Sequence, residues 1–198
     1  MGHAPENTRE SFEKAIALGC DEVETDVWLV SGRLAIAHDR ENAATAPLSL
    51  DDVLDVCRDR VTVNVELKCA DSEAAARETG RAAAAHLGAR GGAGAYVSSF
   101  WWAALEGARD AAPAVRRAYI YSGAPHLGTL IERARELGLF ALHVSHRYVT
   151  PELVAAAHRA SLEVEAWTVN EPTRIAELVR LGVDAISSDF PERIPRGD

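Results

Sequence analysis

The first 28 residues, MGHAPENTRESFEKAIALGCDEVETDVW, decide how the fold is to be read. Residues 8–19 have the apolar spacing of a helix that ends in Leu-Gly, and the first β-rich run follows only at 21–28. A helix that precedes every strand is unusual in an α/β domain, because the first helix normally covers a sheet that has already begun. We therefore expect a sheet that lacks its first strand.

The rest of the chain alternates short β-rich runs with helical stretches, which predicts a parallel sheet. The further strands are expected at 33–38, 61–67, 95–100, 116–121, 141–146, 163–169 and 184–189. The further helices are expected at 49–58, 72–88, 101–111, 127–138, 150–160 and 172–182. Only Ser31-Gly32 separates the first two strands, which predicts a hairpin with no room for a helix.

Seven strands remain when the hairpin partner at 33–38 is set aside, and a closed (β/α)8 barrel has eight. We predict an α/β fold of the (β/α)8 TIM-barrel type that lacks the first strand at the N-terminus. A single domain is expected over residues 1–198, a length that suits one core and is short for two. An open seven-stranded sheet is the alternative.

Composition limits the classes of partner. The formal net charge of −9 argues against a nucleic-acid backbone or an anionic membrane surface as the main partner. No apolar run approaches the ~20 residues of a membrane helix. The three cysteines lack metal-ligand spacing and no signal peptide is visible, which together indicate reduced thiols in a cytoplasmic protein. A signal peptide encoded before Met1 is the alternative.

Two predicted strands turn polar side chains toward one face. Residues two apart on a strand share a face, so Glu24 and Asp26 project together. On the next parallel strand, Asn64, Glu66 and Lys68 do the same. Barrel interiors are normally filled with branched aliphatic side chains, and three carboxylates facing one centre repel one another. A hard divalent cation, Mg²⁺ or Ca²⁺, would remove that repulsion. The alternative is a solvated rim on which an acid pairs with arginine.

A histidine and a lysine accompany these acids. His38 ends the second hairpin strand, so the tight turn keeps it close to Glu24 and Asp26. A neutral imidazole beside a metal-bound phosphate can transfer protons near neutral pH, although a lone histidine at a strand end is often structural. Lys68 offers a cation for a phosphate oxygen that the metal leaves uncovered.

Several motifs follow one another along nearly the whole chain. They are PENT (5–8), VETDV (23–27), AHD (37–39), NVELK (64–68), SSF (98–100), AWTVN (166–170) and GVDAISSDFPE (182–192). This ordered set resembles the glycerophosphodiester phosphodiesterase family. The resemblance implies a (β/α)8 barrel that hydrolyses glycerophosphodiesters to glycerol 3-phosphate and an alcohol, a reaction of lipid metabolism.

The resemblance also implies roles for single residues. By match, Glu24, Asp26 and Glu66 look like the ligands of one divalent cation. His38 looks like one of two catalytic histidines, and Lys68 like a phosphate contact. Trp167 resembles a family tryptophan that lines the substrate pocket, and Phe100 is expected to help wall it. For both aromatic residues, simple core packing is the alternative.

The chain departs from the family in two places. Family members carry His-Arg-Gly a few residues before PENT, and that tripeptide supplies the other catalytic histidine and a phosphate-holding arginine. This chain begins inside the same loop, where His3 is a poor replacement. We expect a start assigned too far downstream or a shortened chain. A non-catalytic relative that binds metal and phosphate without turnover is the alternative. The segment after His38 is also compact, which leaves the preferred alcohol open.

The predicted reaction uses the cation to stabilise charge on the phosphate, one histidine to deprotonate the nucleophile and the other to protonate the leaving alcohol. The nucleophile, water or the neighbouring glycerol hydroxyl, stays open, and a lyase that releases a cyclic phosphate from a lipid is a related alternative. His143 and His146 stand three apart on a predicted strand and would point to opposite faces, so we expect no transition-metal site there.

Overall fold

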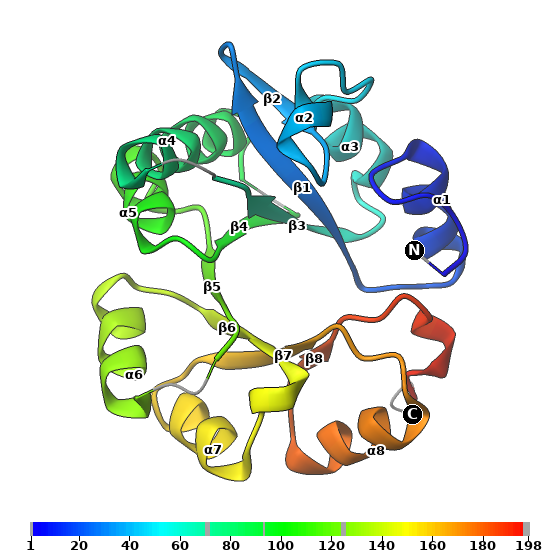
Figure 1. Ribbon diagram of the computed structural model, residues 1–198, viewed down its shortest axis with the longest axis vertical. Helices are drawn as coiled ribbons and strands as arrows, with labels where there is room; N and C mark the ends of the chain where they lie inside the picture. Colours follow the sequence, from blue (N-terminus) through cyan, green and yellow to red (C-terminus); the bar gives the residue numbers. More distant parts are fainter. Residues whose placement is uncertain (1, 70–71, 93, 124–125, 196–198) are drawn as a thin grey trace. The chain divides into compact units, whose positions relative to one another are not determined.

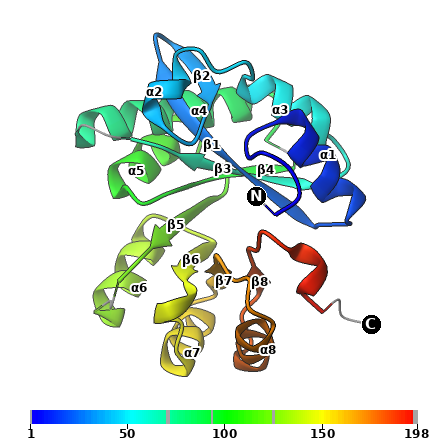
Figure 2. The same cartoon turned by 45° about the vertical axis from the view of Figure 1, so that its right-hand side comes forward.

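A computed structural model describes residues 2–69, 72–92, 94–123 and 126–195 (Figures 1 and 2). The strands are β1 (Glu22–Val30), β2 (Arg33–Ile36), β3 (Thr62–Leu67), β4 (Ala95–Ser99), β5 (Arg117–Tyr121), β6 (Ala141–Ser145), β7 (Glu163–Trp167) and β8 (Ala185–Ile186). The α-helices are α1 (Arg9–Ala17), α2 (Arg40–Ala43), α3 (Leu50–Cys57), α4 (Glu73–Ala89), α5 (Trp102–Ala111), α6 (Leu127–Glu136), α7 (Pro151–Arg159) and α8 (Pro172–Leu181). Two 3₁₀ turns, η1 (His146–Tyr148) and η2 (Pro191–Arg193), complete the elements.

The strands form one sheet in the order β2-β1-β3-β4-β5-β6-β7-β8. β1 and β2 are antiparallel, whereas the pairs β1–β3, β3–β4, β5–β6, β6–β7 and β7–β8 are parallel. The hairpin turn has Ser31 and Gly32 at φ of 50° and 79°, the left-handed values of a tight two-residue connection. Strand-helix alternation and the hairpin are therefore confirmed. No strand precedes α1 within the described residues 2–8.

The chain divides into two compact units, residues 3–117 and residues 118–198 with Gly2. The first unit holds the hairpin, β3, β4 and the helices α1 to α5. The second holds β6 to β8 and the helices α6 to α8. A single domain over residues 1–198 stays a prediction.

Some elements differ from the prediction. The predicted strand at 184–189 is reduced to Ala185–Ile186, and at its expected end the backbone N–H of Asp189 donates to the Asn170 side chain at 3.0 Å rather than to a neighbouring strand. The stretch after His38, expected to be a compact loop, contains the short helix α2. The strand expected at 141–146 ends at Ser145, and η1 begins at the next residue, His146.

The hairpin and α2 share a small apolar cluster. Its buried members are Ala35, Ala37, Ala43 and Ala46, and Trp28 and Val30 pack against it. Small side chains let α2 lie close to the hairpin, since an alanine adds only one methyl group between the two backbones. The contact supports the segment that carries His38.

On β3, both faces are buried, but they differ in kind. Val63, Val65 and Leu67 are at most 1% exposed and form an apolar face. Asn64 and Glu66, 2% and 9% exposed, form the opposite face. A buried polar face is costly unless its groups are paired, and this face carries the candidate site.

Helices α4 and α5 lie side by side in both views and touch through two glycines (Figures 1 and 2). A Cβ added at Gly80 would come within 1.9 Å of the Ala104 carbonyl oxygen. One added at Gly107 would come within 2.1 Å of the Arg77 carbonyl oxygen. Backbone cannot move aside as a flexible side chain does, so both positions require glycine.

Gly107→Ala should therefore lower the free energy of unfolding by about 1–3 kcal/mol, the usual cost of overpacking a core. The matched control is Gly128→Ala in α6, where an added Cβ would lie 3.8 Å from its nearest neighbour. This control should be as stable as the parent or slightly more so, because alanine favours the helix. Urea denaturation of the parent and the two variants gives the free energies of unfolding. Equal changes in that free energy in both variants would refute a close contact between α4 and α5.

Candidate functional site

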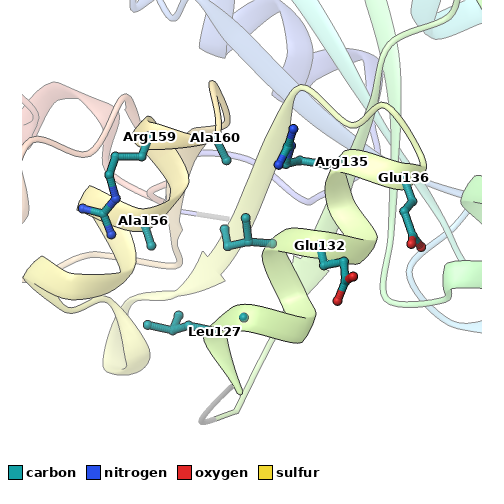
Figure 3. Close-up of a pocket in the computed structure, with 9 residues that line it drawn as sticks. Leu127, Glu132, Arg135, Glu136, Ala156, Arg159 and Ala160 are labelled. Atoms are coloured by element: carbon teal, nitrogen blue, oxygen red, sulfur yellow. The ribbon is translucent and has the colours of Figure 1, made fainter.

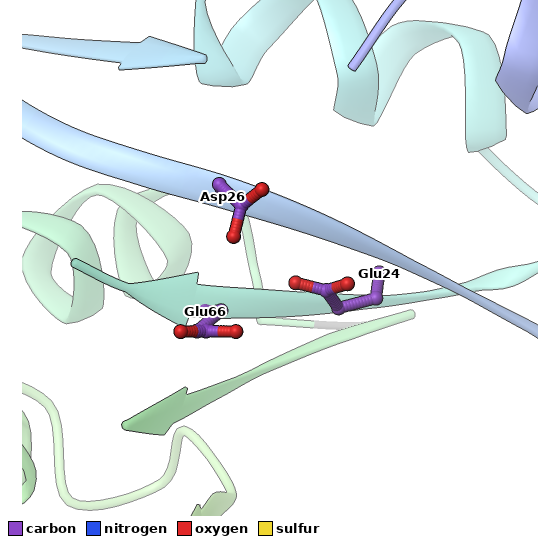
Figure 4. A group of neighbouring side chains, drawn as sticks. All are labelled: Glu24, Asp26 and Glu66. Atoms are coloured by element: carbon purple, nitrogen blue, oxygen red, sulfur yellow. The ribbon is translucent and has the colours of Figure 1, made fainter. Parts of the chain in front are cut away.

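Three carboxylates gather on the polar face of β1 and β3 (Figure 4). Glu24 and Asp26 come from β1 and Glu66 comes from β3. The parallel register places Asp26 opposite Glu66 and Glu24 opposite Asn64, so the three side chains share a face. Each offers one oxygen, and these oxygens lie within 4.8 Å of one another. The structure thus brings together the three acids that the sequence singled out.

Two of these acids are buried. Asp26 and Glu66 are only 4% and 9% exposed, whereas Glu24 is exposed. Burial is the largest cause that raises the pKa of Glu66, and the charge of Asp26 adds to it, while Lys68 works in the opposite direction. The group therefore concentrates negative charge where water cannot fully screen it.

Lys68 lies directly against the two buried acids. Its Nζ atom is 2.9 Å from Asp26 Oδ1 and 2.5 Å from Glu66 Oε1. Burial alone would lower the pKa of this ammonium, but the charges of Glu66 and Asp26 outweigh burial and raise it above its ordinary value. Lys68 is thus a permanent cation that compensates the acids. Its predicted contact with a substrate phosphate stays a prediction.

The residues present fit a hard divalent cation. All three candidate ligands are carboxylates, the donors that Mg²⁺ and Ca²⁺ prefer, and their oxygens are close enough together to share one ion. The ammonium of Lys68 already lies between two of the acids, so the pocket suits positive charge. In the part of the chain that the structure describes, this is the one group of three or more histidine, cysteine or acidic side chains with such spacing.

His38 follows the hairpin strand β2 and sits beside the acidic strand. The backbone N–H of its neighbour Ala37 donates to the Asp26 carbonyl at 3.2 Å. The His38 side chain is 51% exposed, and its Nδ1 lies 3.1 Å from Asp39 Oδ1. In the tautomer in which Nδ1 carries the proton, Nδ1–H donates a hydrogen bond to Asp39, and the lone pair on Nε2 is available to act as a general base. The catalytic role of His38 stays a prediction.

The two aromatic residues lie in different units. Phe100 follows β4 and is 42% exposed. Trp167 ends β7, and its indole N–H donates to the His143 carbonyl at 3.0 Å. Trp167 lines a cavity of about 320 Å³ within the second unit, together with Ser122, Ser145, His146, Arg147, Tyr148 and Thr168. The predicted substrate-pocket roles of Trp167 and Phe100 both stay predictions.

The remaining histidines singled out in the sequence have other surroundings. His143 is 3% exposed, and its Nε2 lies 3.2 Å from Glu165 Oε2. Burial lowers the pKa of His143, against the opposing charges of Glu165 and Glu163. His146 opens η1, and burial, aided by Arg174 and Arg147, lowers its pKa. His3 is exposed.

A larger cavity of about 820 Å³ lies between α6 and α7 (Figure 3). Its lining comprises Leu127, Gly128, Ile131, Glu132, Arg135, Glu136, Ala156, Arg159 and Ala160. None of the predicted site residues is among them. Cavity size alone therefore does not identify the catalytic site, and the group of Glu24, Asp26 and Glu66 is the better candidate for it.

The sequence pattern of the glycerophosphoryl diester phosphodiesterase family matches residues 1–71 and 44–193, and the chain belongs to this family. A glycerophosphodiester phosphodiesterase from Bacillus altitudinis is 27% identical, with 97% of this chain and 92% of the relative covered. None of the helices in the described residues is long and apolar enough to cross a membrane.

Solved structures agree with the family and the fold. A phosphodiesterase from Oleispira antarctica, in complex with the product sn-glycerol-3-phosphate, is 26% identical with a TM-score of 0.83, covering 98% of this chain and 91% of its own. A glycerophosphodiester phosphodiesterase from Parabacteroides distasonis has a TM-score of 0.83 at 20% identity, covering 96% and 88%. The fold class is therefore that of the TIM-barrel phosphodiesterases, as predicted.

Lys68→Met should destabilise the metal-free protein, because it leaves Asp26 and Glu66 without their counter-charge. We expect a loss of about 3 kcal/mol in the free energy of unfolding, the lower end of the range for breaking a buried ion pair. Saturating Mg²⁺ should then raise the melting temperature more in Lys68→Met than in the parent, since the cation supplies the missing positive charge.

Thermal unfolding in EDTA and in Mg²⁺ measures both effects, with Lys68→Arg as the charge-conserving control. Equal metal-induced shifts in the parent and Lys68→Met would contradict the idea that lysine and cation compensate the same acids.

Proposed function

We propose that the protein is a metal-dependent phosphodiester hydrolase that cleaves glycerophosphodiesters to glycerol 3-phosphate and an alcohol, within lipid and glycerol-phosphate metabolism. The observation that carries the proposal is the close group of Glu24, Asp26 and Glu66, with Lys68 against it. Family membership and the sn-glycerol-3-phosphate bound to the Oleispira antarctica relative support the substrate class.

Glu24, Asp26 and Glu66 would hold one divalent cation, Mg²⁺ or Ca²⁺, which when bound lowers the energy of charge developing on a phosphate oxygen. The protein supplies the remaining groups. Lys68, already fully charged beside these acids, can turn its ammonium toward a phosphate oxygen. Its side chain is 20% exposed, so it reaches the surface of the site.

His38 would move a proton at the reacting oxygen. Asp39 orients the ring through Nδ1, and the exposed position lets Nε2 meet a substrate. In the second unit, Trp167 and its neighbouring hydroxyl and imidazole groups would enclose part of a small polar ligand. We propose a cytoplasmic setting as well, supported by three cysteines that all lie outside disulfides.

Single substitutions separate the metal ligands from the proton-transfer group. Glu24→Ala, Asp26→Ala and Glu66→Ala should each weaken Mg²⁺ or Ca²⁺ binding and abolish turnover, because each removes a hard oxygen ligand. His38→Gln should leave metal affinity unchanged and lower turnover about 10²–10⁴-fold. Calorimetric titration with MgCl₂ and CaCl₂ gives the affinities, and release of glycerol 3-phosphate from a panel of glycerophosphodiesters gives the rates.

Each outcome has a separate meaning. If all three alanine variants bind metal as the parent does, the metal ligands are wrongly assigned. If the parent binds metal but turns over no glycerophosphodiester, the protein is a non-catalytic relative. Release of a cyclic phosphate from a lipid would instead indicate a lyase.

A further inference from the structure

Asn7, the asparagine of the PENT motif, makes three hydrogen bonds to β1, the strand that carries Glu24 and Asp26. Asn7 Nδ2 donates to Asp26 Oδ2 at 2.8 Å. Asn7 Oδ1 accepts from Thr25 Oγ1 at 2.9 Å and from the Asp26 backbone N–H at 3.2 Å. The Asn7 side chain therefore hydrogen-bonds both the carboxylate and the backbone N–H of Asp26.

The backbone around Asn7 is itself held in place. Asn7 has a φ of 55°, a left-handed conformation that asparagine tolerates better than most residues. The next residue, Thr8, caps α1, and Thr8 and Ser11 form a reciprocal capping box. The amide of Asn7 is thus anchored to the start of a helix, which makes it a rigid partner for Asp26.

The same arrangement occurs a second time, in the second unit. Asn170 Nδ2 donates to Asp189 Oδ2 at 2.7 Å. Asn170 Oδ1 accepts from Ser188 Oγ at 3.1 Å and from the Asp189 backbone N–H at 3.0 Å. In both copies the asparagine precedes its aspartate by 19 residues, and a helix and then a strand begin between them.

The two copies differ two residues before the aspartate. Glu24 precedes Asp26 and belongs to the acidic group. Ser187 precedes Asp189 and donates its hydroxyl to Glu165. This set of three hydrogen bonds from an asparagine to an aspartate and the residue before it, called here the asparagine clamp, therefore occurs without a cation site in the second unit. Within the described residues, only the aspartate of the first copy, Asp26, belongs to a candidate cation site.

We propose that Asn7 is a positioning residue that sets the orientation of the metal ligand Asp26; this rests on the proposed function. Asn7 holds Oδ2, while Oδ1 points toward Lys68 at 2.9 Å and so toward the other acids. A fixed second oxygen prevents the carboxylate from rotating about its Cβ–Cγ bond. Hydrogen bonds of this kind to ligating side chains commonly set metal affinity.

Asn7→Gly tests the proposal, because glycine accepts the positive φ while the amide is lost. Asn170→Gly is the matched control, since it removes the same three bonds from the other copy. Calorimetric titration of both variants and the parent with MgCl₂ and CaCl₂ gives affinities, and thermal unfolding in EDTA gives stabilities. We expect Asn7→Gly to bind about 10–100-fold more weakly than the parent and Asn170→Gly to bind equally well.

A milder pair keeps the proposal testable if Asn7→Gly fails to fold. Thr25→Val removes one bond that steadies Asn7, and Ser188→Ala is its counterpart in the second unit. Thr25→Val should weaken metal binding by a smaller factor, and Ser188→Ala should leave it unchanged. Parent-like affinity in the Asn7 and Thr25 variants, or equal losses in both copies, would overturn the positioning role. Absence of metal binding in the parent would instead overturn the proposed metal site itself.

Discussion

Repulsion among three carboxylates on one face of β1 and β3 is the constraint on which this site depends. Asp26 and Glu66 are almost fully buried, so water cannot relieve the repulsion. The structure compensates with an ammonium from Lys68 and with hydrogen bonds from Asn7. The β1–β2 hairpin then brings the segment that carries His38 back against β1, where the Ala37 backbone N–H donates to the Asp26 carbonyl. Lys68, Asn7 and the backbone of Ala37 therefore all contact the two buried acids or their strand.

Much of this arrangement followed from short-range rules of the sequence. Alternation along a strand placed Glu24 with Asp26, and the parallel order of strands brought Glu66 beside them, as the register confirms. The turn at Ser31-Gly32 required a hairpin because two residues leave no room for a helix. Strand-helix alternation gave the fold class, and most predicted boundaries lie within a few residues of the observed ones.

Other features depend on side-chain geometry that no sequence rule specifies. The ion pairs of Lys68 with Asp26 and Glu66 were not predicted, because a long flexible side chain can turn to any nearby charge, and its contact with a substrate phosphate stays a prediction. The clamp by Asn7 joins residues 19 apart, and its recurrence at Asn170 becomes visible only when the hydrogen bonds are known. The hydrogen bond from the Asp189 backbone N–H to the Asn170 side chain, at the end of the strand predicted over 184–189, is likewise set by side-chain geometry.

The central claim is that Glu24, Asp26 and Glu66 form one cation site. When no cation is bound, Lys68 compensates the negative charge of Asp26 and Glu66. Anomalous diffraction from crystals soaked in MnCl₂, a metal that suits the same oxygen ligands, locates the ion directly. The account predicts one strong peak in contact with all three carboxylates, with Lys68 Nζ moved away from Asp26 and Glu66. A peak elsewhere, or no peak while Lys68 keeps both ion pairs, would contradict it.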